Sequence, residues 1–378
     1  MQPLITTPIA RIREGARNFA IRTLGSIRFG LDEQILEQLA FNRLGRKPPE
    51  LMWKACARCP RLRVEAGQAV IGGRLYLMGG YETIATVVDV VDVFDVRKGR
   101  WTDQFPMPSG MAQTHTGIAS DGKRFIYIAG GQLGPHCSPA VASCRVLDAS
   151  THTWTELPPL PEPRYAPVLQ LWRGRLHAVA GSRPDRGTPA SEHWSIAVND
   201  GQALEGGWRA EVPIPLGGTH RASAVFGDAL YVFGGHGGDV KPLEGDPNYT
   251  CDWNSAVESA LSESFLLEPG VSQWKAIAPM PEPRSHTEHA IVQIGACAVV
   301  VGGVKSHTEY SDLIQSYDTR TDRWKIVGRL PYGMKTNATY HEGWSYVITG
   351  QRTRSMDDLN PGVVVNSVWR TKIDPASL

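Results

Sequence analysis

Residues 229–235, ALYVFGG, decide the fold. They form an apolar run that ends in two glycines, and a strand that is apolar on both faces must be covered by protein on both sides. The pattern recurs as RLYLMGG (74–80), FIYIAGG (125–131) and AVVVGG (298–303), and in weaker form as RLHAVAG (175–181) and SYVITG (345–350). The position of the first glycine, taken by Ala180 and Thr349 in the two weaker copies, recurs at steps of 51, 50, 54, 68 and 47 residues. Such a regular period predicts a repeat architecture.

Each repeat unit shows the same order of features. A proline-rich connection comes first, as in PMPSG (106–110), PLPEPR (159–164), PIPLGG (213–218), PMPEPR (279–284) and RLPYG (329–333). A short strand, the apolar strand and a third strand follow, and a fourth strand carries a tryptophan: Trp101, Trp154, Trp208, Trp274 or Trp324. Four antiparallel strands per unit, repeated radially, predict the blades of a β-propeller.

The ends of the chain predict how the ring closes. The sixth unit ends with the strand-like segment 364–373 and has no fourth strand of its own. The segment LMWKA (51–55) has the character of a fourth strand, with Trp53, but precedes the first unit. We therefore expect an all-β, six-bladed propeller over residues 50–373, in which 51–55 completes the last blade and removes an unpaired edge. Residues 374–378 form a tail.

Residues 1–49 form a basic N-terminal arm. A helix is expected over about 32–44, because Asp32 can cap its start, an apolar stripe follows and Gly45 ends it before Pro48. Residues 1–31 carry five arginines and one acidic residue, Glu14. That composition fits a transit peptide as well as an arm that is disordered or packed on the propeller.

Composition limits the classes of function. The chain has 378 residues and a formal net charge of +1, so it lacks the basic field typical of nucleic-acid binders. It contains no apolar run of the roughly 18 residues that a transmembrane helix needs. Six cysteines are too few for a disulfide scaffold, although Cys137 and Cys251 would share a face and could pair in an oxidising compartment.

The Gly-Gly, aromatic-Asp and Trp positions at these spacings resemble the kelch repeat. The chain is also similar to plant kelch-repeat-containing proteins of the galactose oxidase/kelch repeat superfamily. The shared blocks are GQLGPHC (131–137), LPPLPEPRYAP (157–167), QLWRGRLH (170–177), EHWSIAV (192–198), PIPLGGTHRA (213–222), LPYGMKT (330–336) and SVWRTK (367–372).

This resemblance implies a kelch propeller without a settled activity. Plant members resemble membrane-anchored proteins of the secretory pathway with a lumenal propeller, which suggests the Golgi lumen. No such anchor is evident in this sequence, so an organelle or the cytoplasm stays open. The copper-ligand pattern of galactose oxidase and the Glu-x-x-x-Asp-x-x-x-His run of iron-dependent specifier proteins are missing. We therefore expect no metal, no cofactor and a monomer.

Function in a propeller collects in the loops at the two ends of the central channel. Loops before the first strand and after the second strand of each unit meet at one of these ends, the channel mouth. The side chains expected to bind a ligand at this mouth are His115, Arg164, Tyr165, His220, Arg221, His236, Arg284, His286, Glu288, Lys335 and Arg352. Arginine forks favour carboxylate and phosphate oxygens, which predicts an anionic small molecule, an acidic carbohydrate or an acidic peptide as partner.

Two alternatives stay open for these residues. Each arginine or histidine could instead bond to a neighbouring blade and fix the ring. In the stretch SHTEH (285–289), a strand would place His286 and Glu288 on one face and His289 on the other. His286 and Glu288 would then be the acid and base of a non-redox isomerase, epimerase or lyase acting on an acidic carbohydrate. A metal site would require His115, His220 and His286 to converge, which we do not expect.

Overall fold

The computed structural model describes residues 51–136, 139–238, 260–306, 309–352 and 363–378. The N-terminal arm with its expected helix, and the cysteines Cys137 and Cys251, lie outside these ranges. Within them the chain is almost entirely β-structure, with one short 3-10 helix, η1 (Pro375–Ser377), near the end. The predicted all-β propeller is confirmed.

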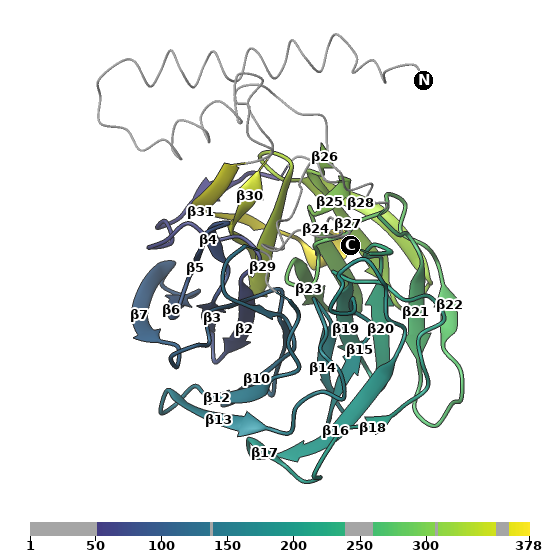
Figure 1. Cartoon of the computed structure of the whole chain (residues 1–378). Helices are drawn as coiled ribbons and strands as arrows, with labels where there is room; N and C mark the ends of the chain where they lie inside the picture. Colours follow the sequence, from purple (N-terminus) through teal and green to yellow (C-terminus); the bar gives the residue numbers. More distant parts are fainter. Residues whose placement is uncertain (1–50, 137–138, 239–259, 307–308, 353–362) are drawn as a thin grey trace, which may run out of the picture.

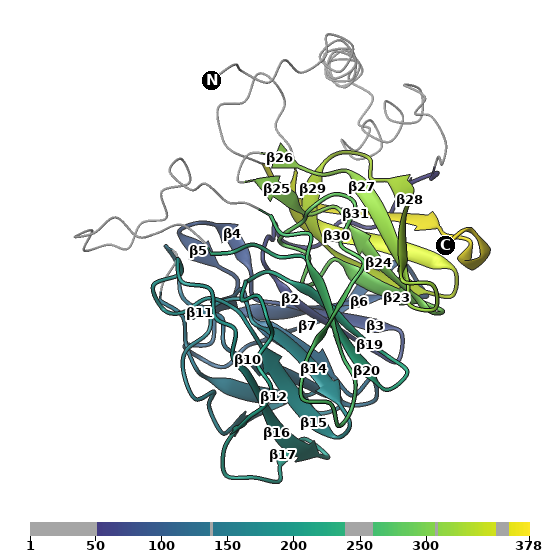
Figure 2. The same ribbon diagram turned by 90° about the vertical axis from the view of Figure 1, so that its right-hand side faces the viewer.

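Six antiparallel sheets follow one another around the ring as blades one to six (Figures 1 and 2). Blade one contains β2 (Gly67–Ile71), β3 (Arg74–Met78), β6 (Val90–Asp95) and β7 (Arg100–Pro106). Blade two contains β9 (Gly117–Ser120), β10 (Phe125–Ala129), β12 (Cys144–Asp148) and β13 (Thr153–Leu157). Blade three contains β14 (Val168–Trp172), β15 (Arg175–Val179), β16 (His193–Asn199) and β18 (Arg209–Ala210), with β17 (Gln202–Ala203) also paired to β16.

The second half of the ring repeats this order. Blade four contains β19 (Ala222–Phe226), β20 (Ala229–Phe233), β21 (Ser264–Leu267) and β22 (Lys275–Ile277). Blade five contains β23 (Ile291–Ile294), β24 (Cys297–Val301), β27 (Leu313–Asp318) and β28 (Arg323–Arg329). Blade six contains β29 (Met334–His341), β30 (Trp344–Arg352), β31 (Val363–Lys372) and β1 (Lys54–Ala55).

Short hairpins extend the loops between blade strands. They are β4 (Tyr81–Thr83) with β5 (Thr86–Val87), β8 (Gln113–Thr114) with β11 (Gln132–Leu133), and β25 (Val304–Ser306) with β26 (Glu309–Tyr310). The first strands of neighbouring blades contact one another, so these strands line the central channel. The loops that precede them therefore lie at the channel mouth.

The apolar core consists of one cluster at each junction between blades. Phe233 on β20, for example, packs with Ala298 and Tyr317 of blade five. Four of the five repeated tryptophans also link neighbouring blades, each by donating its indole N–H to a carbonyl of the preceding blade. These bonds are Trp101 to Ala57 (3.2 Å), Trp208 to Pro158 (2.9 Å), Trp274 to Val212 (3.0 Å) and Trp324 to Ala278 (2.8 Å).

Blade six joins the two ends of the described chain. Lys54 and Ala55 of β1 pair antiparallel with Arg370 and Trp369 of β31, so β1 is shorter than the strand expected over 51–55. In Figures 1 and 2 the purple start of the chain accordingly lies beside the yellow last blade. Trp53 donates to the Arg329 carbonyl at 2.8 Å, in the same way as the four tryptophans named above. That this contact holds the ring closed stays a prediction.

The paired glycines are required by close backbone contacts as well as by their turns. Gly79 has φ +62°, and a Cβ there would overlap the carbonyl oxygen of Gln113 in blade two. Gly227, in the turn between β19 and β20, has a similar φ of +56° but open space around it. The two positions therefore separate the cost of the backbone conformation from the cost of the contact.

We expect Gly79→Ala to lower the free energy of unfolding by about 2–4 kcal/mol, because it combines left-handed backbone strain with overpacking. Gly227→Ala should cost only about 1–2 kcal/mol, because it carries the strain alone. Urea unfolding followed by tryptophan fluorescence measures both values. Equal losses would show that close approach of the blades does not select the glycine.

Candidate functional site

Five blades place a residue with left-handed backbone shortly before the channel-lining strand, two residues before it in blades one to four and five residues before it in blade five. These residues are Glu65 (φ 57°), His115 (φ 55°), Ala166 (φ 42°), His220 (φ 53°) and His286 (φ 55°). A non-glycine residue in this region costs on the order of 1–3 kcal/mol and is often found at functional sites. The repeat thus turns one glutamate and three histidines toward the mouth of the channel.

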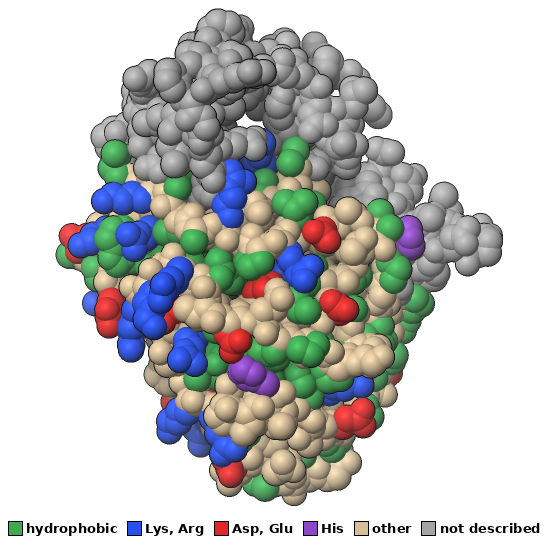
Figure 3. All heavy atoms as spheres, turned by 90° about the vertical axis from the view of Figure 1, so that its left-hand side faces the viewer, with side chains coloured by type: hydrophobic (Ala, Val, Ile, Leu, Met, Phe, Trp, Pro, Cys, Tyr) green, Lys and Arg blue, Asp and Glu red, His purple; other side chains and the backbone are tan. Residues whose placement is uncertain are grey.

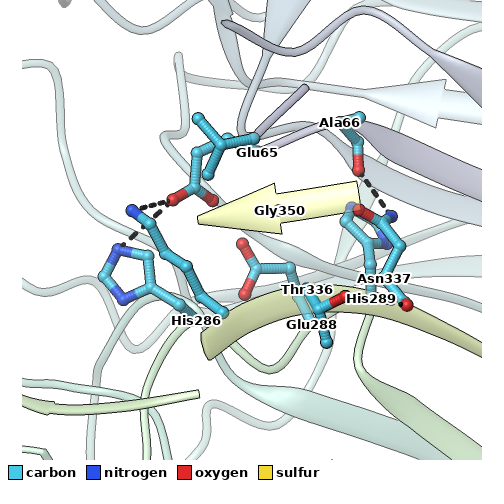
Figure 4. A pocket seen from close by; sticks show the side chains of 10 residues that line it. Glu65, Ala66, His286, Glu288, His289, Thr336, Asn337 and Gly350 are labelled. Carbon is cyan, nitrogen blue, oxygen red and sulfur yellow. Dashed lines mark hydrogen bonds and ion pairs between the residues drawn. The ribbon is translucent and has the colours of Figure 1, made fainter. Parts of the chain in front are cut away.

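The carboxylate of Glu65 is the centre of this cluster. Lys335 donates its ammonium N–H to Glu65 Oε1, and the Nε2 atoms of His286 and His115 lie 3.7 and 3.8 Å from the Glu65 oxygens. These partners come from blades six, five and two. Figure 4 shows Glu65 and His286 facing each other near the strand that carries Gly350. The Glu65 and Lys335 side chains are each only 6% exposed, so solvent screens the ion pair weakly.

A second carboxylate, that of Glu288, lies next to the first. It accepts a hydrogen bond from His220 Nδ1 at 2.7 Å. Burial acts to raise the pKa of Glu288, but the charge and hydrogen bond of His220 oppose it, and the pKa is lowered to about 2. Two residues after the left-handed position, three other blades have Gly67, Gly117 and Ala222, so this acid is particular to blade five.

The stretch SHTEH is not the strand that we expected. Residues 286–290 form turns, and β23 begins only at Ile291. His289 therefore does not point away from Glu288; both line the same hollow, as Figure 4 shows. His289 Nε2 lies 3.2 Å from the carbonyl oxygen of Thr116 in blade two, across the channel. The partner of Glu288 is His220 and not His286.

The hollow is small. Its walls are Val64, Glu65, Ala66, His286, Glu288, His289, Lys335, Thr336, Asn337 and Gly350. It has room for about one water molecule. A larger ligand would need a side chain of the cluster, such as that of Glu65, to move.

The histidines stack on one another. The rings of His220 and His286 are 3.9 Å apart at their centroids and nearly parallel at 15°. His236 follows the glycine pair of blade four and stacks at 5.1 Å on His220 and 5.5 Å on His286. One ring nitrogen from each of these three histidines lies within 4.8 Å of the others. Burial, followed by the neighbouring His220, holds the pKa of His286 well below 6.5, so its ring is neutral at pH 7.

Arg164, Arg284 and Arg221 lie inside the ring and do not face the channel mouth. This is the alternative in which an arginine bonds to the blades and not to a ligand. Arg164 is fully buried, donates to Glu192 at 2.9 Å and to Glu162 at 3.0 Å, and lies over the Trp194 ring. Arg284 is also fully buried and donates to the Gly302 carbonyl at 3.0 Å.

Arg221 is internal as well, and it compensates for a glycine. Blade four has Gly218 where blades three and five have Arg164 and Arg284. The Arg221 side chain fills that space, since a Cβ at Gly218 would meet Arg221 Nε at 3.0 Å. Burial lowers the pKa of Arg221 to about 10, while Glu263 acts to raise it. The expected basic mouth is thus a histidine-rich mouth in which the arginine charges are taken up inside the blades.

Exposed cations gather elsewhere. Arg370, Lys372 and Lys54 surround the Trp344 ring at 4.5, 5.2 and 5.8 Å on the outer strands of blade six. Figure 3 shows Lys and Arg side chains grouped on one face of the molecule. Arg352, expected at the mouth, lies over the Tyr332 ring at 5.5 Å and is not among the residues that line the hollow.

Two mouth residues were missed by the sequence argument. Glu65 stands alone in VEAG without a motif, and Arg186 lies in a polar turn, PDRG (184–187). Arg186 donates to Tyr165 Oη at 2.6 Å and to Gln132 Oε1 at 2.8 Å, and it stacks on the Tyr165 ring. Tyr165 in turn stacks on His115 at 4.5 Å. Aligning the blades at the left-handed position would have revealed Glu65, since it is the counterpart of His115.

The fold and the mouth define a six-bladed propeller with a polar channel end. Comparison with known proteins agrees: the family model described as "Kelch motif" matches residues 62–108 and 126–161. A kelch repeat-containing protein of Arabidopsis thaliana is 40% identical over 332 residues, which cover 86% of this chain and 77% of that protein. The chain belongs to the kelch-repeat family.

Two further matches are more distant. Kelch-like protein 23 of Homo sapiens is 25% identical over 293 residues, 70% of this chain and 50% of the human protein. The solved structure titled "Structure of YjhT" superposes with a TM-score of 0.61 at 14% identity, covering 83% of this chain and 96% of that one. At this identity the likeness shows the fold alone. Within the described ranges, no helix has the length and apolar character needed to cross a membrane.

Proposed function

We propose that this kelch propeller is a binding module for a carboxylate-bearing ligand, either an acidic carbohydrate or an acidic peptide side chain, at the channel mouth. The observation that carries the proposal is the convergence of Lys335, His115 and His286, from three blades, on the single carboxylate of Glu65. Charge-assisted hydrogen bonds to a carboxylate are among the stronger polar contacts in proteins. Groups arranged around an internal carboxylate are suited to a ligand carboxylate of the same chemistry.

In this proposal Glu65 is an internal competitor. A ligand carboxylate takes its place on Lys335, and the Glu65 side chain turns out of the hollow, which makes room for the ligand. Glu288 does not compete for the lysine, because it accepts from His220 at 2.7 Å. Lys335 supplies the positive charge, since His286 is neutral at pH 7. The proposal retains the acidic ligand predicted from the sequence, but Lys335 and the histidines contact it in place of the arginines.

A non-redox isomerase, epimerase or lyase acting on an acidic carbohydrate is the second candidate. The pair of His220 and Glu288 favours it, because a carboxylate that orients an imidazole prepares it to accept a proton. His220 would then be the base and Glu288 its positioning residue. Glu288→Gln should lower turnover while affinity for the substrate is kept, whereas a pure binding module shows no turnover at all.

Glucuronate, a sugar acid, is a suitable probe of the binding proposal. We expect it to raise the melting temperature of the propeller, because a ligand that binds only the folded state stabilises it. Lys335→Met should abolish the rise, since it removes the charge that holds the carboxylate. Differential scanning fluorimetry measures the shift, and galactose, which lacks the carboxylate, should leave the melting temperature unchanged.

The matched control is Lys98→Met. Lys98 is 58% exposed beside Asp95 on blade one, so its loss should leave the glucuronate shift intact. The double variant Glu65→Gln/Lys335→Met removes both charges of the internal pair and guards against a folding defect caused by an unpaired glutamate. If Lys335→Met and Lys98→Met respond to glucuronate alike, the proposed site is wrong.

A further inference from the structure

We propose that His220, His236 and His286 form a binding site for a divalent transition-metal ion of the zinc class. Their side chains come from three separate loops of blades four and five, and one nitrogen of each lies within 4.8 Å of the others. Imidazole nitrogens are the ligands that zinc, copper, iron and nickel share. The inference does not depend on the proposed carboxylate ligand.

The centroid separations of two of the three histidine pairs match those of a three-histidine site, although the rings are stacked nearly parallel. With metal–nitrogen bonds of about 2.0–2.1 Å and tetrahedral angles, three imidazole centroids lie about 5.2 Å apart. The observed separations are 5.1 Å for His220 and His236 and 5.5 Å for His236 and His286. The His220 and His286 centroids are 3.9 Å apart and the rings are nearly parallel at 15°, so the two rings must separate by about an ångström and turn toward each other for both lone pairs to meet the ion.

Each of the three imidazoles is held through its Nδ1 atom. His236 Nδ1 donates to the Gly238 carbonyl oxygen at 2.7 Å, and a carbonyl can only accept. His220 Nδ1 donates to the Glu288 carboxylate at 2.7 Å, and His286 Nδ1 lies 2.9 Å from Ser285 Oγ. The acceptors of His220 and His236 fix the proton on Nδ1, so the lone pair of each lies on Nε2. The Ser285 hydroxyl can donate or accept, so His286 can take up the same tautomer when the ion binds. Metal-binding histidines are oriented by bonds of this kind to a carboxylate or a carbonyl.

Nearby acids can balance the charge of the ion. Glu65 Oε1 lies 3.7 Å from His286 Nε2, and Glu65, His220 and Glu288 form a second group whose ligand atoms also lie within 4.8 Å of one another. Three histidine ligands leave the fourth position of a tetrahedral ion open. Sites with an open position hold water or a substrate atom there. The water-sized hollow is lined by His286 and Glu288, so it borders the histidine cluster.

Zinc binding to the full chain tests the inference. After dialysis against a chelator, isothermal titration calorimetry with ZnCl₂ at pH 7.5 should show one saturable equivalent, and zinc should raise the melting temperature. His236→Gln should weaken zinc binding more than 100-fold, because it removes a direct ligand. Glu288→Gln keeps all three imidazoles and should weaken binding about 10- to 100-fold, because it removes the group that orients His220.

His341→Gln is the matched control. His341 lies in blade six beside Glu342, away from the stacked rings, and its loss should leave the zinc isotherm unchanged. Circular dichroism confirms that each variant is folded, and Glu288→Gln decides the test if His236→Gln is not. The proposal is wrong if zinc shows no saturable binding, or if wild type, His236→Gln and Glu288→Gln bind it equally. Either result would mean that the bound zinc is adventitious only and that the histidines serve packing. Lys335→Met should keep zinc binding while it loses glucuronate, so the two proposals fail separately.

Discussion

Asp92→Ala is expected to lower the free energy of unfolding by about 3–5 kcal/mol, the usual cost of leaving a buried charge without its partner. Asp92 and Arg63 form an ion pair inside blade one, and both side chains are 0% exposed. Arg63 also donates to the Gly79 carbonyl at 2.7 Å, so it joins the blade entrance to the glycine pair. Loss of the aspartate leaves a guanidinium that cannot reach water.

Urea unfolding followed by tryptophan fluorescence measures this cost, with Asp228→Ala as the control. Asp228 pairs with Arg173 where both side chains are more than half exposed, and exposed pairs contribute about 0–1 kcal/mol. The double variant Arg63→Met/Asp92→Leu should recover most of the stability, because apolar side chains of similar size can replace a buried pair. A loss at Asp92 no larger than that at Asp228 would contradict the structural role of the blade arginines.

The second large effect is expected at Trp53. Trp53→Ala should lower the free energy of unfolding by about 3–5 kcal/mol, as deletion of a large buried side chain does. Trp53 is 0% exposed and packs in the cluster between blades five and six, with Trp369 and Leu330. Beyond β1, Cys56 N–H donates to the Val368 carbonyl at 2.8 Å, so the segment follows β31 for several residues.

From this packing we infer that the segment around Trp53 closes the ring. Removal of residues 50–57 should then abolish soluble folding, because β31 would become an open edge. Trp53→Phe keeps most of the apolar volume and should cost about 1–2 kcal/mol, chiefly the hydrogen bond to Arg329. Met52→Ala, at a side chain that is 61% exposed, should change stability by less than about 0.5 kcal/mol. A truncated chain that folds normally would contradict ring closure.

The fold was predictable because its signals are local and repeated. In ALYVFGG the apolar run and the glycines occur within seven residues, and six copies fix the number of blades. The apolar run predicts a buried strand and the glycines predict a sharp turn, and neither prediction requires knowledge of the tertiary contacts. The strand predicted for SHTEH was wrong because a turn, closed by the bond from the Ala290 N–H to the Thr287 carbonyl at 3.0 Å, delays the start of β23 to Ile291.

The site was predictable only in part, because its contacts join distant residues. His220 and Glu288 are 68 positions apart, and Glu65 meets a lysine 270 positions away. The sequence placed His115, His220, His286, Glu288 and Lys335 at one mouth, and the structure brings them together. The sequence could not show that Arg164 and Arg284 form ion pairs with glutamates of their own blades, because these pairs depend on the directions of the side chains within each blade.

The proposal that the Lys335 cluster holds a carboxylate is tested most directly by the affinity of Glu65→Gln for glucuronate, measured by isothermal titration calorimetry beside wild type. If Glu65 is the internal competitor, its neutral variant should bind about 10-fold more tightly, which corresponds to about 1.4 kcal/mol. Equal or weaker binding by Glu65→Gln, in a variant that melts as wild type does, would contradict the proposal.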